Sequence, residues 1–137
     1  WLSSLEMIRL GLRVPKTIAY VEHGALGAIW GNAFVYEYLE DCLPALQFLE
    51  PLIKKEDRDS IDAFFTNLAE AVTGLAEAKV FHRDLKLDNV LTPDGREFFF
   101  IDLDEALINQ PFEPKHRMRN HIQMGNEIGR ASCRERV

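Results

Sequence analysis

The residues with the clearest chemical potential lie in the stretch from His82 to Asn89 and in a second stretch that follows it. Asp84 and Asn89 are five positions apart with Lys86 between them, and Asp102 follows Asn89 by thirteen positions. Phosphoryl transfer needs an acidic side chain that receives or orients the attacking hydroxyl, and oxygen ligands that hold Mg²⁺ against the nucleotide phosphates. The set therefore predicts phosphoryl-transfer chemistry, which no single one of these residues would indicate by itself.

A short β-hairpin is expected to bring Asn89 and Asp102 close together. Residues 90–91 and 98–101 are apolar segments of the type that forms buried strands. Between them, residues 92–95 read Thr-Pro-Asp-Gly, in which Pro presets φ and Gly permits a positive φ, as a tight turn requires. At the open end of such a hairpin, two oxygen ligands suit a hard cation such as Mg²⁺, which takes its other ligands from water and phosphate.

His82 lies directly before the Arg-Asp pair and directly after the apolar Val80-Phe81 segment. An imidazole at this place could act as a base. Buried polar side chains, however, are in most cases simply satisfied by hydrogen bonds. We therefore expect His82 to be a structural hydrogen-bonding residue.

Helical periodicity is strongest from about Ser60 to Ala78, where apolar residues recur at intervals of three and four and give one wide apolar face. Asp59 or Ser60 is a suitable N-cap for this helix, which we expect to pack beneath the stretch 82–89. The remaining pattern predicts a helix over residues 1–12 that stops near Gly11, extended runs over 17–22 and 33–39 with a turn at 24–27, short helical pieces over 43–53, and a charged loop over 54–59.

Length and charge bound the kind of protein. The chain has 137 residues, enough for one modest domain, and a net charge of −6. This acidic balance argues against nucleic acid or an anionic membrane surface as the main partner. No apolar run approaches the length of a transmembrane helix.

Residues 127–137 differ from the rest of the chain. They form a polar, Arg-rich run that resembles a translated sequencing adapter, so we leave them out of the fold interpretation and expect them to pack against nothing. Without their three Arg and two Glu, 13 basic and 20 acidic residues remain. Cys133 lies in this run, which leaves Cys42 as a single cysteine. A single cysteine indicates no disulfide framework and no zinc site, and it fits a reducing cytoplasm.

With these motifs in view, the chain resembles the protein-kinase-like superfamily and, within it, the bacterial lipopolysaccharide core kinases that phosphorylate heptose and Kdo sugars. Residues 82–89 match the superfamily's H-R-D-x-x-x-x-N. Residues 101–104, Ile-Asp-Leu-Asp, look more like that family's I-D-x-D than the protein kinases' D-F-G. Residues 13–22 resemble the family's segment before the hinge, with Thr17 in place of its second Pro. The resemblance covers residues 1–126.

The resemblance implies an α+β, protein-kinase-like fold that is truncated. Residues 1–38 would be the end of the small lobe, a helix and two strands that lead to the hinge. Residues 39–126 would be the first part of the helical large lobe with the catalytic β-hairpin, and residues 127–137 the adapter-derived tail. The Gly-rich phosphate loop and the V-A-I-K lysine are absent from the 137 residues. The helix glutamate that pairs with that lysine is expected before Trp1, with Glu6 as the alternative.

By the same resemblance, Asp84 is the catalytic base or hydroxyl-orienting carboxylate, and Lys86 neutralises the transferring phosphoryl group of the nucleotide. Asn89 and Asp102 would bind Mg²⁺. One departure from the family pattern is Lys79, which stands where Gly is usual.

Residues 36–39 resemble the hinge that binds the adenine of ATP. The backbone groups of Glu37 and Leu39 would face the adenine edge. An ordinary buried strand end is the alternative interpretation of this segment.

The implied function is an ATP- and Mg²⁺-dependent kinase that acts on a hydroxyl, with a lipopolysaccharide core sugar as the acceptor. Its place would be the cytoplasm, with peripheral contact at the inner membrane. A Ser/Thr protein kinase is the alternative within the enzymes, although residues 105–126 contain no A-P-E tripeptide. A non-catalytic pseudokinase or binding module is the alternative outside them. It would tolerate the loss of Asp84, Asn89 or Asp102, and all three are present.

Overall fold

The computed structural model describes residues 2–25, 28–109, 113–116, 118–120 and 122–125. In chain order the elements are α1 (Leu2–Arg9), β1 (Thr17–Ala25), β2 (Ala28–Tyr36), β3 (Leu43–Pro44), α2 (Ala45–Lys54), α3 (Arg58–Glu77), the 3₁₀ helix η1 (Leu87–Asn89), β4 (Val90–Thr92) and β5 (Phe99–Phe100). Further helical residues lie at 114–116, 118–120 and 122–125. The expectation that residues 127–137 pack against nothing lies outside the described residues.

The three short strands form an antiparallel sheet in the order β3-β4-β5, and the predicted catalytic hairpin is its β4–β5 half. Val90 pairs with Phe100 and Leu91 with Phe99, as the hairpin interpretation requires. Gly95 in the connecting turn has φ +72°, and its amide donates to Thr92 Oγ1 over 2.8 Å. A Cβ at Gly95 would stand 2.7 Å from the Phe48 ring, so the turn needs Gly for its conformation and for space.

The core lies between α2, α3 and this sheet. Helix α3 presents one buried face to it, formed by Phe64, Leu68, Val72 and Leu75, as its periodicity predicted. The ring of Phe64 stands edge-on to Phe98 at 5.5 Å and stacks on Phe48 at 5.9 Å between centroids. These contacts join α3 to α2 and to the strand segment that carries the hairpin.

Helix α3 begins earlier than predicted. Its N-cap is Asp57, not Asp59 or Ser60: the Asp57 side chain accepts hydrogen bonds from the Ser60 amide over 3.2 Å and from the Ser60 hydroxyl over 2.8 Å. The charged loop is therefore shorter than 54–59, with only residues 55–57 between the two helices. Asp57, Asp59 and Ser60 lie close together in the sequence and can each cap a helix, so only the geometry selects the one that accepts hydrogen bonds from the first helix amides.

The helices α1, α2 and α3 all end in the same way, with a residue at positive φ: Gly11, Glu56 and Lys79 respectively. After α3, the Lys79 amide donates to Ala76 O over 3.1 Å and the Val80 amide to Leu75 O over 2.8 Å, which is the Schellman pattern. Lys79 has φ +57°, the conformation that favours the Gly usual at this place. After α1, the predicted stop Gly11 has φ +78° in the same role.

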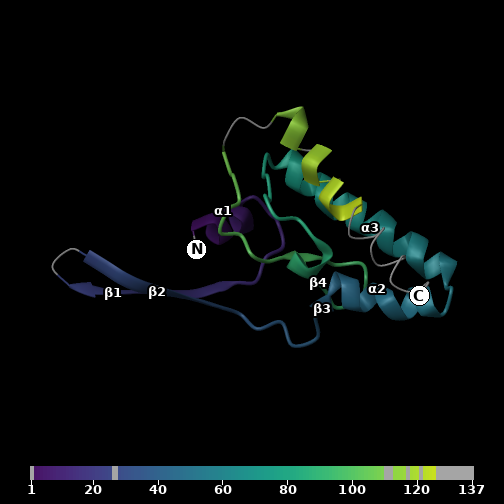
Figure 1. Cartoon of the computed structure of the whole chain (residues 1–137), viewed down its shortest axis with the longest axis horizontal. Helices are drawn as coiled ribbons and strands as arrows, with labels where there is room; N and C mark the ends of the chain where they lie inside the picture. Colours follow the sequence, from purple (N-terminus) through teal and green to yellow (C-terminus); the bar gives the residue numbers. More distant parts are fainter. Residues whose placement is uncertain (1, 26–27, 110–112, 117, 121, 126–137) are drawn as a thin grey trace.

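Strands β1 and β2 form a separate two-stranded antiparallel hairpin that projects from the rest of the molecule (Figure 1). The second strand covers Ala28–Tyr36, whereas the pattern predicted residues 33–39. Pairing decides the difference, because the ladder runs from Thr17↔Tyr36 to Ala25↔Ala28. Gly24, predicted to start the turn, pairs with Ile29 inside the ladder. Residues 26–27, between the two strands, lie outside the described residues.

Candidate active site

Two buried leucines fix the loop that carries the predicted catalytic residues. Leu85 and Leu87 are both fully buried in the core. Asp84, which precedes Leu85, has a side chain that is 52% exposed, and Lys86, which lies between the two leucines, has one that is 40% exposed. The chain thus alternates between core and cleft along this stretch. The alternation anchors the backbone and leaves the polar groups accessible to a ligand.

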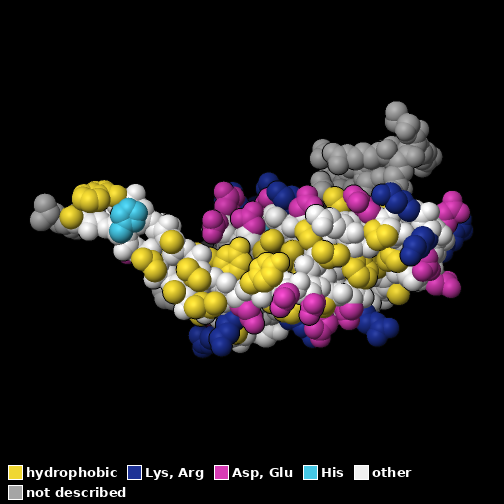
Figure 2. All heavy atoms as spheres, turned by 90° about the horizontal axis from the view of Figure 1, so that it is seen from below, with side chains coloured by type: hydrophobic (Ala, Val, Ile, Leu, Met, Phe, Trp, Pro, Cys, Tyr) yellow, Lys and Arg dark blue, Asp and Glu magenta, His cyan; other side chains and the backbone are white. Residues whose placement is uncertain are grey.

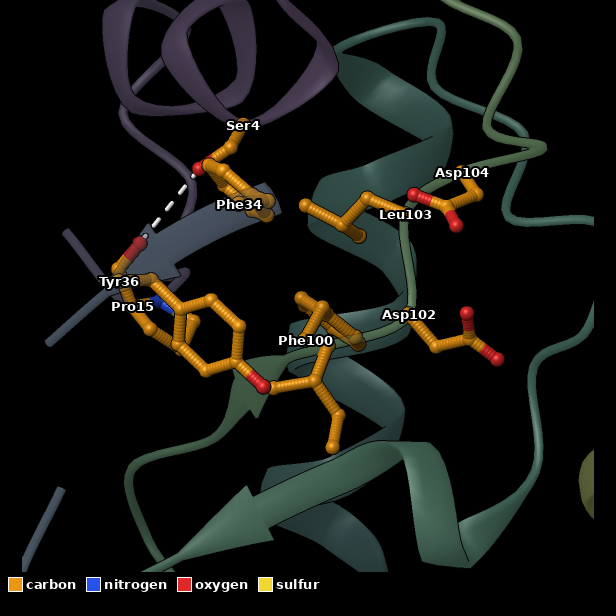
Figure 3. A pocket seen from close by; sticks show the side chains of 9 residues that line it. Ser4, Pro15, Phe34, Tyr36, Phe100, Asp102, Leu103 and Asp104 are labelled. Atoms are coloured by element: carbon orange, nitrogen blue, oxygen red, sulfur yellow. Dashed lines mark hydrogen bonds between the residues drawn. The ribbon is translucent and has the colours of Figure 1, made fainter. Parts of the chain in front are cut away.

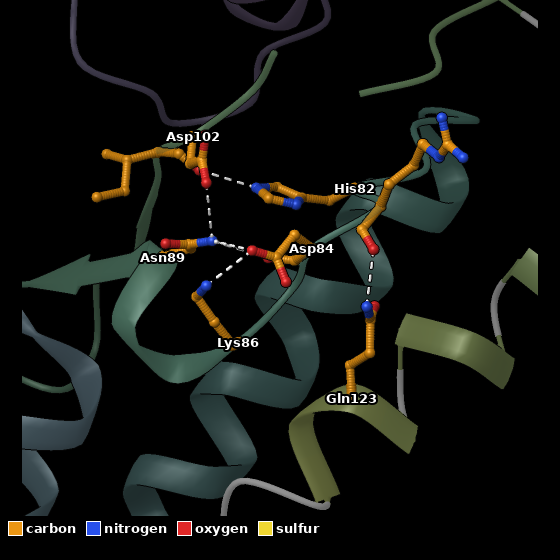
Figure 4. Close-up of polar contacts among 8 residues, drawn as sticks. His82, Asp84, Lys86, Asn89, Asp102 and Gln123 are labelled. Atoms are coloured by element: carbon orange, nitrogen blue, oxygen red, sulfur yellow. Dashed lines mark hydrogen bonds and ion pairs between the residues drawn. The ribbon is translucent and has the colours of Figure 1, made fainter. Parts of the chain in front are cut away.

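Asn89 joins the carboxylates of the site (Figure 4). Its Nδ2 donates to Asp84 Oδ2 over 3.1 Å, to the Asp84 carbonyl over 2.9 Å and to Asp102 Oδ2 over 3.3 Å. The predicted proximity of Asp84, Asn89 and Asp102 is therefore confirmed. Their catalytic and metal-binding roles stay predictions.

The backbone brings Asp102 to this position. The Ile101 amide donates to the Asn89 carbonyl over 3.0 Å, which continues the β4–β5 pairing as far as the site. Asp102 then has φ +59°, in the left-handed region that Asp tolerates better than most residues, at a cost of roughly 1–2 kcal/mol. The strand turns there, and the Asp102 carboxylate meets the Asn89 amide.

Lys86 forms an ion pair with Asp84 that stabilises the charged carboxylate. Nζ of Lys86 is 2.8 Å from Asp84 Oδ2. This hydrogen bond lowers the pKa of Asp84 and raises the pKa of Lys86. Asp84 is consequently a stable carboxylate, suited to accept a hydrogen bond from a hydroxyl.

His82 ties the loop to the strand that ends at Asp102. The side chain is 1% exposed, and its Nε2 is 2.8 Å from the Ile101 carbonyl (Figure 4). Burial lowers the pKa of His82, so the ring is neutral at neutral pH and donates from Nε2 to this carbonyl. Its other nitrogen is buried with no hydrogen-bond partner. The structural role predicted for His82 agrees with this geometry.

The donor set fits a magnesium ion. Among the described residues no group of three or more His, Cys, Asp or Glu side chains could hold a metal by itself. Mg²⁺ does not need one, because it is commonly bound through one or two carboxylates together with waters and substrate phosphates. Asp102 and the Asn89 amide oxygen would be these ligands. The Asn89 amide now directs its nitrogen toward the carboxylates, so ligation would require it to rotate and present Oδ1.

A cavity of about 300 Å³ opens beside Asp102 (Figure 3). Apolar side chains form most of its wall; it is lined by Ser4, Pro15, Phe34, Tyr36, Phe100, Ile101, Asp102, Leu103 and Asp104. Such a cavity, with a few polar groups at one end, has the size and character of a small-molecule site. Ser4 and Phe34 carried no signal in the sequence, since nothing local links them to residues 101–104, which lie 67 or more positions further along the chain.

The predicted hinge is only partly at this cavity. Tyr36 lines it, whereas Glu37 and Leu39 are not among its lining residues. The Glu37 amide donates to the Lys16 carbonyl over 2.8 Å, which extends the β1–β2 ladder by one bond. The adenine contacts of Glu37 and Leu39 stay predictions.

Gln123 is a site residue that sequence reasoning missed. Its Nε2 donates to the Arg83 carbonyl over 2.7 Å, directly before Asp84 (Figure 4). The two residues are 40 positions apart. No local pattern of residues could have predicted this contact. Through it, a residue near the C-terminal end of the described chain holds the backbone of the catalytic loop.

A protein-family model described as "Lipopolysaccharide kinase (Kdo/WaaP) family" matches residues 3–133. The matched range includes every predicted site residue, and it also extends into the 127–137 run set aside above. A comparison with curated proteins gave no match.

A similar fold occurs in a solved structure of WaaP in complex with acyl carrier protein, with a TM-score of 0.74 and 18% sequence identity. The match covers 93% of this chain and 56% of that one, so this chain spans about half the length of that protein. At this identity the likeness shows the fold alone, and it confirms the expected α+β fold.

Proposed function

The chain belongs to the lipopolysaccharide kinase (Kdo/WaaP) family, and we propose that the protein is an ATP- and Mg²⁺-dependent kinase that phosphorylates a hydroxyl of a lipopolysaccharide core sugar. The observation that carries this proposal is the cluster at the Asn89 amide, whose Nδ2 lies 3.1 Å from Asp84 Oδ2 and 3.3 Å from Asp102 Oδ2. In this proposal residues 1–38 are the end of the small lobe, and residues 39–126 the first part of the large lobe.

Asp84 orients the attacking hydroxyl in this proposal. Its carboxylate accepts hydrogen bonds from Lys86 and Asn89 on Oδ2, which fixes its position. The lowered pKa makes it a weak base. A weak base suffices, because phosphoryl transfer depends mainly on positioning and on electrostatic stabilisation of the transferring group.

Lys86 lies where it can leave Asp84 for the nucleotide. Its side chain is 40% exposed and held by one solvent-accessible ion pair, which contributes little stability. A phosphoryl group placed in the cleft would compete for the same ammonium. The charge of Lys86 would then stabilise the transferring group and release Asp84 for the acceptor.

Asn89 and Asp102 would hold Mg²⁺, which when bound neutralises the phosphate oxygens. The Ile101 amide is bonded to the Asn89 carbonyl, so the spacing of the backbone at Asn89 and Asp102 is set before a ligand arrives. The cavity beside Asp102 would take the apolar part of the nucleotide. Glu37 and Leu39 would contribute backbone groups at its hinge side.

None of the helices among the described residues has the length and hydrophobicity that crossing a membrane requires. We place the protein in the cytoplasm, with peripheral contact at the inner membrane, because its acceptor would be linked to lipid. Nucleic acid is not proposed as a partner, given the net charge of −6.

The decisive experiment measures phosphate transfer and nucleotide binding in the full-length protein. We expect Asp84→Asn to reduce kcat by about 100-fold or more with nucleotide affinity intact, because it removes a group that acts in the transition state. Asp102→Asn should in addition weaken Mg²⁺-dependent nucleotide binding. Asp88→Asn is the matched control, since Asp88 is an exposed carboxylate of the same loop. An Asp84→Asn protein with full activity would show that the assignment is wrong.

A further inference from the structure

The backbone around Asp84 belongs to no helix or strand. Residues 82–86 are turn or irregular residues, so no backbone ladder fixes the dihedral angles of Asp84. Leu85 and Leu87 anchor the loop through buried side chains, which determine where the loop lies but not how each peptide plane is turned. The direction of the Asp84 side chain therefore depends on what holds the two peptide groups beside it.

Two side-chain amides hold these two peptide groups. Gln123 Nε2 donates to the Arg83 carbonyl over 2.7 Å, and Asn89 Nδ2 donates to the Asp84 carbonyl over 2.9 Å (Figure 4). Because each peptide group is planar, a hydrogen bond to its oxygen restricts the rotation of the whole plane. The bond from Gln123 thus restricts φ of Asp84 and the bond from Asn89 restricts ψ. Together they set the direction of the Cα–Cβ bond of Asp84.

The core that anchors the loop also anchors Gln123. Residues 122–125 are helical, and Met124 is 6% exposed and belongs to the same hydrophobic core as Leu85 and Leu87. Asn120, three positions before Gln123, is 2% exposed. Buried side chains therefore precede and follow Gln123 in the chain. The bond to the Arg83 carbonyl joins two parts of the molecule that are each fixed by packing.

The hydrogen bonding of Gln123 indicates a role in position more than in stability. Its Oε1 is buried and has no hydrogen-bond partner among the described residues. A neutral hydrogen bond adds only modestly to stability, and a buried acceptor without a partner costs at least as much. The polar atoms of Gln123 should therefore add little to the free energy of unfolding. What they do supply is an N–H donor at the Arg83 carbonyl.

We propose that Gln123 is a positioning residue of the kinase reaction, which acts through the backbone at Arg83 to aim the Asp84 carboxylate at the acceptor hydroxyl. The inference rests on the proposed kinase function and adds a residue to its machinery. Without the bond, the peptide plane before Asp84 can turn, and the carboxylate loses its alignment with the hydroxyl. Misalignment of a reacting group lowers the rate of the chemical step more than it weakens ligand binding.

The test uses two substitutions of Gln123 in the full-length protein. Gln123→Met keeps the length of the side chain and removes both the donor and the unpartnered oxygen. Gln123→Glu keeps the shape and replaces the donor by a second oxygen. Gln47→Met is the matched control, because Gln47 is exposed on α2.

Four quantities are measured for each protein. Steady-state kinetics give kcat and the KM for ATP and for a deacylated lipopolysaccharide core oligosaccharide. Urea unfolding gives the stability. The carbonyl-carbon NMR shift of Arg83 reports the hydrogen bond at that oxygen directly, and it does not depend on activity.

We expect kcat to fall about tenfold in both Gln123 variants, between the effect of one lost hydrogen bond and that of a fully misplaced group. The KM for ATP and for the oligosaccharide should not change. The Arg83 carbonyl shift should move in both variants, and Gln123→Met should be at least as stable as the wild type. The Gln47→Met control should differ from the wild type in none of these values.

Three results would overturn the role of Gln123 and leave the kinase function standing. They are an unchanged Arg83 carbonyl shift, a full kcat beside an inactive Asp84→Asn protein, and a fall in kcat that only follows a loss of stability. Full activity of Asp84→Asn would instead refute the kinase assignment, and the role of Gln123 with it.

Discussion

Asn89 is the residue on which the site is built, because its one amide group contacts both carboxylates. His82 supports it from the other side by holding the Ile101 carbonyl next to Asp102. Lys86 completes the set through its ion pair with Asp84. The Lys86–Asp84 contact is exposed, so substitution of Lys86 should change chemistry more than folding. His82 and Asn89 are buried and each bonds a backbone carbonyl, so their substitution should also affect folding.

The first prediction concerns the charge of Asp84. The hydrogen bond from Lys86 lowers the pKa of Asp84, so Lys86→Met should raise that pKa toward its ordinary value. The carboxylate will then become protonated at a higher pH than in the wild type. Carboxyl-carbon NMR titration of the 137-residue chain measures this midpoint. Lys54→Met, an exposed substitution on α2, should leave it unchanged, and an unchanged midpoint in Lys86→Met would contradict the pairing.

At the scale of elements, the site depends on how helices and strands end. Helix α3 stops at a Schellman motif, and the chain then enters the loop at Val80, which is fully buried. The β4–β5 hairpin begins where η1 ends and closes through Gly95. The position of Asp84 between these two structures is therefore fixed at both sides.

The second prediction follows from the Lys79 conformation. Lys79 is exposed at φ +57°, so Lys79→Gly should stabilise the protein by about 1 kcal/mol by removing the left-handed strain. Lys55→Gly is the opposite case, because Lys55, the residue before the left-handed Glu56, has a right-handed helical φ of −86°. Lys55→Gly should lower the free energy of unfolding by about 0.5–1 kcal/mol. Urea unfolding of the two variants measures both values, and a destabilised Lys79→Gly would refute the strain.

At the scale of the whole molecule, the structure divides into a packed body and a projecting hairpin. Figure 2 shows apolar side chains gathered along the narrow arm, where Ile18 is 65% and Trp30 71% exposed. By contrast, the residues on the buried face of α3 are each no more than 4% exposed. A two-stranded ribbon with so little burial has only marginal stability of its own.

The third prediction is therefore that the β1–β2 hairpin opens first. In native-state hydrogen exchange of the 137-residue chain, amides of Val21 and Asn32 should exchange through local opening, well before those of Leu68 and Val72. Exchange of the α3 amides should instead follow global unfolding. Equal protection of the hairpin and α3 would show that the arm is stabilised by contacts beyond its own ladder.

The fourth prediction concerns activity of the 137 residues by themselves. They hold Asp84, Asn89 and Asp102 but no Gly-rich loop or V-A-I-K lysine. Positioning and electrostatic stabilisation carry phosphoryl transfer, so the loss of a whole set of phosphate contacts is severe. We expect little or no transfer from the 137-residue chain in a radiolabelled-ATP assay, with Mg²⁺-dependent transfer by the full-length protein. Comparable rates for the two would contradict this.

The sequence by itself determined the parts of this protein that depend on short-range geometry. Asn89 and Asp102 are thirteen positions apart and joined by one tight turn, so strand pairing and the Thr-Pro-Asp-Gly signal were enough to predict their contact. The buried face of α3 followed from helical periodicity, and the stop at Gly11 from the conformational freedom of glycine.

The tertiary structure alone decided what depends on competition or on long-range contact. Asp57 caps α3 because its oxygen reaches the Ser60 amide, although Asp59 and Ser60 had the same chemical ability. The bounds of β2 were set by the length of its partner strand. The bond from Gln123 to Arg83 joins residues that are 40 positions apart. Their meeting depends on the path of the whole chain, which no local pattern of residues encodes.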